Sequence, residues 1–294
     1  MIAQLGNAHF VVIQTLNSLA LGGLLFLLAS GFSLIFGLMR IANLTHGSLF
    51  MLGAYIGVSI MRAGETSLWV AAVLSGLVLA ALGGLFERLV LRALAANAQG
   101  QVLVTLGVSF IVADLCLMVW GGDPIPVQTP EGLRAPVQLA GFVFPTYRLV
   151  VVAIAFGVAG ALYLLIERTR LGAMIRAGVD DMQMARAVGI PVSRLFTTVF
   201  CLGAALAGAG GMIGGPILSA YPGLDGDMLP LALIVVILGG VGSLAGAFVG
   251  SFIIGFIYTF GTALFPDLAY VILFLPMILV IAFRPTGLFG RLSA

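Results

Sequence analysis

The sequence contains little charge and no lysine. Of its 294 residues only 8% are charged and 61% are hydrophobic, with a mean hydropathy of +1.21, and all 13 basic residues are arginine. A water-soluble domain needs more polar surface than this composition supplies, so the chain is an integral membrane protein. The net charge of +2 says little by itself, because the side of the membrane on which each charge lies matters more than the sum.

Cysteine and histidine are also scarce, with two of each. Cys116 and Cys201 fall in apolar segments, where a free thiol behaves as a small hydrophobic group, so we expect no structural disulfide. No spacing of His, Cys, Asp and Glu resembles a metal site, and the run from Gly239 to Ser243 lacks the lysine of a phosphate-binding loop. We therefore expect no catalytic centre, no cofactor bound by this chain and no nucleic-acid partner. Its energy must come from a gradient or from another subunit.

Hydrophobic runs set the number of membrane crossings. A hydrocarbon core of about 30 Å needs roughly 20 apolar residues per helix. The runs predict an all-α polytopic protein with eight or nine transmembrane segments in one domain, 1–294. The uncertain segment is 229–239, which as a helix at 1.5 Å per residue would cover about half a bilayer. If it re-enters the membrane without crossing, eight spans remain and the N-terminus moves inside.

Arginine is distributed unevenly between the ends of these runs. With nine crossings, an outside N-terminus and an inside C-terminus, ten of the 13 arginines lie inside, as the positive-inside rule requires. The inside set is Arg40, Arg88, Arg92, Arg168, Arg170, Arg176, Arg186, Arg194, Arg284 and Arg291. Only Arg62, Arg134 and Arg148 lie outside.

The most polar segment is 167–194, in which eight of 28 residues are charged, five of them arginine. Glycines divide it into short helices, and these carry an apolar stripe made of Leu171, Met174, Ile175, Met182, Ala185, Val188 and Ile190. Short amphipathic helices on the cytoplasmic side suit a groove in a soluble partner. Lying on the lipid surface is the alternative. We favour the partner.

Two polar turns open hydrophobic segments, one at Asn43, Thr45, His46, Gly47 and Ser48, the other at Asp225, Gly226 and Asp227. Breaks between membrane helices free backbone groups that can meet a polar solute, so these residues are candidates for lining a translocation path. Ordinary helix capping, by Thr45 or Ser48 and by the two aspartates, is the alternative. The turns correspond at an offset of 179 residues on opposite sides of the membrane, which indicates either an inverted repeat or a chance similarity.

Asp114 is the one acid well inside a predicted span. Intramembrane acids are costly and often functional, so Asp114 would be the ion-coupling group of a gradient-driven carrier or channel. A proton-coupled transporter usually has several such groups. We therefore favour a structural or interfacial role near Trp120.

Four segments carry a family resemblance: 33–55, 168–190, 234–247 and 284–289. Together they resemble the signature of LivH-type permeases of branched-chain amino-acid ABC importers. One departure lies at Gln183, Met184 and Ala185, where the family often has Glu-Ala-Ala. Permeases for urea and short amides share these motifs, so they are an alternative for the substrate.

The resemblance implies a type II ABC importer-like permease in the bacterial inner membrane. It would pair with a second, LivM-like permease and with two cytoplasmic ATP-binding subunits, and a periplasmic substrate-binding protein would deliver a branched-chain or related hydrophobic amino acid. The chain would not itself be an enzyme, because the partner subunits use the ATP. Segment 167–194 would be the coupling loop, with contacts to the ATPase from Arg168, Arg170, Gly172, Arg176, Asp181, Ala185, Arg186, Gly189 and Ile190.

Overall fold

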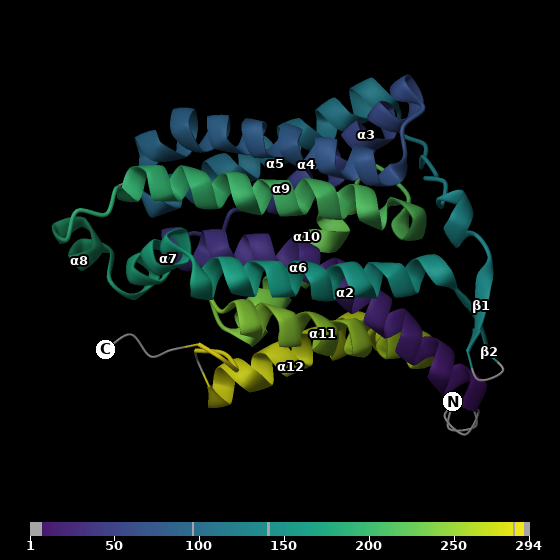
Figure 1. Cartoon of the computed structure of the whole chain (residues 1–294). Coiled ribbons are helices and arrows are strands. Elements are labelled where there is room, and N and C mark those ends of the chain that lie inside the picture. Colours follow the sequence, from purple (N-terminus) through teal and green to yellow (C-terminus); the bar gives the residue numbers. More distant parts are fainter. Residues whose placement is uncertain (1–7, 96, 140–141, 285, 291–294) are drawn as a thin grey trace.

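The structure is a computed structural model that describes residues 8–95, 97–139, 142–284 and 286–290. Arg291 and residues 1–7 lie outside this part of the chain. Among the residues that the structure describes, nine helices of 15 residues or more form a bundle, shown in Figure 1. They are α2 (Ala8–Met39), α3 (Thr45–Gly64), α4 (Leu68–Phe86), α5 (Ala98–Trp120), α6 (Thr146–Arg168), α9 (Val192–Leu218), α10 (Leu224–Gly239), α11 (Leu244–Leu264) and α12 (Ala269–Phe283).

Within the described residues, seven helices are long and apolar enough to cross a membrane: α2, α3, α4 with its extension to Leu94, α5, α6, α9 and α11. Helices α10 and α12 are shorter, with 16 and 15 residues. The expected helical multi-pass membrane protein is therefore confirmed. The glycine run from Gly239 to Ser243 separates α10 from α11, and Gly240 and Gly242 have φ values of 100° and 78° there.

A small β-hairpin interrupts the otherwise helical fold. Strands β1 (Pro136–Leu139) and β2 (Phe142–Pro145) pair antiparallel within 121–147, which the sequence presents as a proline-rich loop. A backbone bridge ties the same loop to the α9–α10 connection, because Ile125 and Ala220 exchange N–H···O bonds of 2.7 and 3.0 Å.

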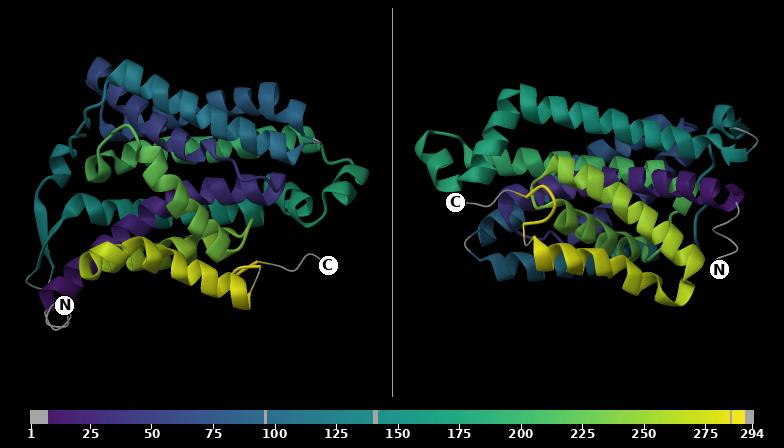
Figure 2. Two further views of the ribbon diagram at one scale, coloured as in Figure 1. Left: turned by 180° about the vertical axis from the view of Figure 1, so that it is seen from behind. Right: turned by 90° about the horizontal axis from the view of Figure 1, so that it is seen from below.

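The two ends of the bundle differ. The hairpin lies beside the start of α2 at one end, where the rings of His9 and Phe142 are 5.4 Å apart. Two short helices between α6 and α9, α7 (Arg170–Asp180) and α8 (Met182–Ala187), project from the other end, as the views of Figure 2 show. The segment after α12 is fixed near the same end as α7, where Leu288 and Phe289 donate backbone bonds to Leu238 and Gly239.

Glycine allows the central helices to approach closely. A Cβ on Gly31 of α2 would lie 2.7 Å from the carbonyl oxygen of Gly203 in α9, and a Cβ on Gly53 of α3 would overlap the backbone of Gly208. Small residues permit this backbone contact, which is the usual means of helix association in lipid. The result is a closely packed centre formed by α2, α3, α4 and α9.

Helices α3 and α10 begin inside this bundle. Nε2 of His46 lies 3.0 Å from the carbonyl oxygen of Leu28, which is 11 residues before the end of α2 and so about 16 Å from it. The first turn of α10 meets that of α3, because Ser48 Oγ donates a 3.0 Å hydrogen bond to Asp225. The two polar turns of the sequence are therefore neighbours in space.

Candidate functional site

Side-chain caps shape the loop between α6 and α9. Thr169 Oγ1 accepts from the N–H of Gly172 at 3.1 Å and begins α7. Asp181 Oδ1 accepts from the N–H groups of Gln183 and Met184 at 2.8 and 3.0 Å and begins α8. Gly189 follows α8 with a φ of 88°, a conformation that L side chains rarely adopt. Short helices are present as expected, but glycines do not separate them: Gly172 and Gly178 lie inside α7, and the break before α8 is at Asp181.

The apolar stripe of these helices packs mainly against the chain itself. Ile175 and Ala185 are buried, and four further members of the stripe are half-buried against the bundle: Leu171, Met174, Met182 and Ile190. Only Val188 of the stripe is exposed, together with the neighbouring Met184. The polar face of the pair and its tip are therefore the parts that remain exposed.

Charged residues of the loop fall into two groups. Arg176 faces inward, where it pairs with Glu167 at 3.4 Å and donates to the carbonyl oxygen of Ile166. Gly172 packs on the same backbone. The remaining candidates, Arg168, Arg170, Asp181, Arg186 and Gly189, are exposed.

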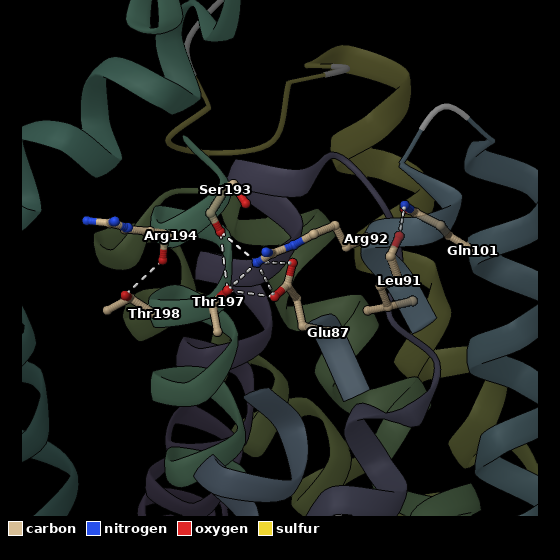
Figure 3. A network of polar contacts seen from close by, with 8 residues as sticks. All are labelled: Glu87, Leu91, Arg92, Gln101, Ser193, Arg194, Thr197 and Thr198. Carbon is tan, nitrogen blue, oxygen red and sulfur yellow. Dashed lines mark hydrogen bonds and ion pairs between the residues drawn. The ribbon is translucent and has the colours of Figure 1, made fainter. Parts of the chain in front are cut away.

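A buried polar network joins α9 to the end of α4, where the helix continues as a π-helical turn, Glu87–Leu91 (Figure 3). Glu87 is 1% exposed and pairs with Arg92 at 3.1 Å. Thr197 Oγ1 donates to Glu87 and accepts from Arg92, both at 2.7 Å, and Arg92 also donates to the carbonyl oxygen of Ser193 at 3.1 Å. Ser193 and Thr197 lie in the first two turns of α9, directly after the α7–α8 pair.

The sequence reasoning missed this network. Its one local signal is an acid that directly follows a 19-residue apolar helix and precedes Arg92 by five residues. Thr197, which completes the network, is 110 positions from Glu87. A π-turn often marks a functional position in a membrane helix.

The network continues toward the first polar turn. The carbonyl oxygen of Leu91 accepts from Gln101 Nε2 at 2.9 Å. Gln101, Asn43 and Thr105 help to line a cavity of about 10 Å³, which is room for about one water. Asn43 Nδ2 and Gln101 Oε1 have no hydrogen-bond partner among the described residues.

A larger cavity of about 870 Å³ opens at the α7–α8 end of the bundle. It lies between this pair and the connection from α4 to α5, and its walls include Arg40, Arg186 and Asp180. Gln101 and Glu87 border it on the side of the network.

The first polar turn is enclosed. Asn43, Thr45, His46 and Ser48 are at most 2% exposed, and His46 stacks on Phe32 with ring centroids 5.3 Å apart. The amide oxygen of Asn43 accepts from the N–H of Thr45 at 3.2 Å. The expectation that Thr45 or Ser48 caps α3 was wrong, because the N-cap residue is Leu44 and no side chain makes a cap hydrogen bond there. Gly47 has room for no side chain, since a Cβ would lie 2.8 Å from the carbonyl oxygen of Asp225.

The second polar turn is more open. Gly226 and Asp227 are exposed and Asp225 is half-buried. Neither aspartate caps α10 through a hydrogen bond, because the N-cap position is Gly223 and Asp227 instead accepts from the Tyr221 hydroxyl at 2.6 Å. The capping expectation for this turn was also wrong. Both acids lie in the first turn, where they interact favourably with the helix dipole.

Comparison with known proteins supplies the family. The family described as "Branched-chain amino acid transport system / permease component" matches residues 14–281. The BraD permease of Pseudomonas aeruginosa is 28% identical over 95% of both chains, and the LivH permease of Salmonella typhimurium is 28% identical over the same shares. The autoinducer 2 permease LsrC of an Enterobacter species is 29% identical over 84% of this chain and 71% of its own.

The match spans almost all of the helical bundle and the polar network. A permease of this kind is the membrane component of an ABC importer and is not itself catalytic; ATPase and binding-protein subunits complete the importer. The chain belongs to the family of branched-chain amino acid transport permeases of ABC importers.

Proposed function

We propose that this chain moves a branched-chain or related hydrophobic amino acid from a periplasmic binding protein to the cytoplasm, across the bacterial inner membrane. It would act with a LivM-like permease and two ATP-binding subunits. The observation that supports this best is the α7–α8 pair, which presents exposed arginines at one end of the bundle and is anchored to it by Arg176 and Ala185. The whole chain, 1–294, then forms one permease domain with 167–194 as its coupling loop.

Nine crossings agree with the arrangement of the helices. The start of α2 lies at the hairpin end, whereas the chain after α12 returns to the end that carries α7 and α8. Helix α10 counts as a crossing in this arrangement, although at 16 residues it is only about 24 Å long. The contact between Ser48 and Asp225 supports an inverted repeat, because transporters of that kind place interrupted helices face to face at the substrate path.

Coupling would run through packed side chains from the loop to the polar turns. An ATPase that displaces α7 and α8 also moves the start of α9, which carries Ser193 and Thr197. These residues hold Arg92 and Glu87, and the adjoining Leu91 carbonyl holds Gln101 beside Asn43. Asp225, Gly226 and Asp227 would then form the open side of the translocation path. Thr45, His46, Gly47 and Ser48, with Asn43, would form its enclosed wall.

The direct contacts to the ATPase would come from the exposed members of the loop. Arg168, Arg170, Asp181, Arg186 and Gly189 are accessible. Gly172, Arg176 and Ala185, which are packed inward, would fix the position of the pair, with half-buried Ile190 at its edge.

Two experiments on the reconstituted importer test this function. Uptake of labelled leucine into proteoliposomes should require ATP and the binding protein, and labelled urea should compete poorly. Efficient urea uptake would move the substrate to the short amides. Leucine uptake without ATP would contradict the importer and favour a gradient-driven carrier or channel.

A further inference from the structure

The cavity of about 870 Å³ at the α7–α8 end of the bundle has the dimensions of a small-molecule site, since ligand pockets commonly measure about 300–1,000 Å³. Its walls come from the end of α2, the π-helical turn after α4, the start of α5, the α7–α8 pair and the start of α9. A molecule bound there touches both the coupling loop and the residues that we propose receive its motion.

Charges of both signs line this cavity in equal number: Arg40, Arg92, Arg186, Glu87, Asp180 and Asp181. Arg92 and Glu87 pair with each other at 3.1 Å, and Asp181 caps α8. A site for an anion carries an excess of cationic groups, and a site for a hard metal ion carries an excess of acids. The balanced set therefore suits a ligand that carries one charge of each sign.

Arg40 and Asp180 come from neighbouring parts of the wall. Nη2 of Arg40, directly after α2, donates to the carbonyl oxygen of Val179 at 3.4 Å, which places the guanidinium beside the end of α7. This long bond uses one of its five N–H donors. Asp180 is the next residue of α7, and its carboxylate has no hydrogen bond or ion pair within the described residues. The first group can bind a carboxylate and the second an ammonium group.

The rest of the wall is largely apolar and contains one buried acceptor. Its apolar members include Leu38, Met39, Ile41, Leu91 and Phe196. Gln101 is 2% exposed, and its Oε1 has no hydrogen-bond partner in the part of the chain that the structure describes. An apolar group on the ligand gains free energy by leaving water for such a wall. A zwitterion with an apolar side chain, in other words a hydrophobic amino acid, matches all of these features.

We propose that this cavity is a regulatory site for a hydrophobic amino acid on the cytoplasmic side. The carboxylate of the ligand pairs with Arg40, its ammonium group pairs with Asp180, and its side chain lies against the apolar wall. The bound molecule contacts α2, the α7–α8 pair and α9 together, so it stabilises their present arrangement against displacement by the ATPase. Solute that has accumulated in the cytoplasm therefore slows its own import. The proposal rests on the proposed function, from which it takes the sidedness and the class of solute.

Uptake into loaded proteoliposomes tests the regulation. Vesicles of phosphatidylcholine that contain the complete importer are loaded with ATP and millimolar unlabelled leucine, and labelled leucine is supplied outside with the binding protein. We expect internal leucine to lower the initial rate at least about threefold. Internal leucinol, which lacks the carboxylate, and 4-methylpentanoate, which lacks the ammonium group, should leave the rate nearly unchanged. No inhibition by leucine, or equal inhibition by all three compounds, would overturn the proposal.

Substitutions in the cavity provide the second arm. Arg40→Gln and Asp180→Asn each remove one charge, and both should abolish the inhibition while uptake into vesicles without internal leucine stays within about twofold. Arg88→Gln is the matched control, because Arg88 lies in the same π-helical turn as Glu87 but outside the cavity wall, and it should retain the inhibition. Undiminished inhibition in both cavity variants would overturn the proposal.

Equilibrium binding separates the site from transport. Labelled leucine is titrated into the purified importer without the binding protein, and both cavity variants should bind it about tenfold more weakly than the control. Unchanged binding in the two variants would overturn the proposal whatever their transport rates. So would a phospholipid that is retained by the unmodified importer and lost from Arg40→Gln, because it would identify a lipid as the occupant. Absence of ATP-dependent leucine uptake by the unmodified importer would instead refute the proposed function, and leucine binding would still decide the site.

Discussion

Replacing Thr197 by valine should loosen the joint between α9 and the end of α4. The hydroxyl donates to Glu87 and accepts from Arg92, both at 2.7 Å, and valine has nearly the same shape without these bonds. Glu87, at 1% exposure, would keep only its contact with Arg92 at 3.1 Å. A hydrogen bond to a charged group contributes about 1.5–3 kcal/mol, and only the bond to buried Glu87 counts in full because the Arg92 side chain is 41% exposed, so Thr197→Val should destabilise the chain by about 2 kcal/mol.

Function should fall more than stability. If the network carries motion from the coupling loop, Thr197→Val should raise the number of ATP molecules hydrolysed for each solute imported. The measurements are thermal unfolding of the purified importer in detergent, and ATP hydrolysis and uptake in the same proteoliposomes. Thr197→Ser retains the hydroxyl and should restore both properties.

Thr198 provides the matched control. It is exposed, and its hydroxyl bonds only to the carbonyl oxygen of Arg194, at 2.9 Å, in its own helix (Figure 3). Thr198→Val should therefore change stability by no more than about 0.5 kcal/mol. Equal effects of the two valine variants would refute the assignment of Thr197 to a buried coupling network.

Three further predictions concern the polar turn and the loop. Asn43→Ala removes the buried hydrogen bond from the N–H of Thr45 and should lower the free energy of unfolding by about 1 kcal/mol in denaturant titration. A stability equal to that of the unmodified chain would show that this bond is unimportant. Gly189→Ala should cost about 1–2 kcal/mol of local stability through the positive φ alone, because a Cβ there meets no atom within 4 Å. Hydrogen exchange should detect faster opening of α8, and an unchanged exchange rate would contradict this. Arg186→Glu should weaken co-purification of the ATPases without changing thermal stability. Arg176→Ala should instead lower thermal stability, because it breaks the contacts with Glu167 and Ile166. The reverse pattern would contradict the division into exposed and anchoring arginines.

Much of the fold follows from the sequence. Apolar runs with arginine at one set of ends are sufficient to predict the long helices, because the bilayer sets their length and charge sets their direction. Short helices in the charged segment were also predictable from its apolar stripe, but their division was not, because Gly172 and Gly178 lie inside α7 and the helices separate at Asp181. That stripe does not indicate which apolar surface it covers, and here it covers the bundle of its own chain.

The polar contacts within the bundle were not predictable. Glu87 reaches Thr197 across 110 residues, and Ser48 reaches Asp225 across 177, so no local pattern marks either pair. The alignment of the two polar turns indicated a relation but not a contact. The β-hairpin was obscured because prolines stand at both ends of its pairing, Pro136 opposite Pro145, where they resemble signals of a loop.

We expect this chain to work only as the membrane part of an ATP-driven assembly. The most direct test is purification of the tagged chain from its native membrane in mild detergent, with mass spectrometry of the proteins that accompany it. We expect two soluble ATP-binding subunits and a second, different permease. A chain that purifies alone, and still transports after reconstitution without ATP, would contradict the claim.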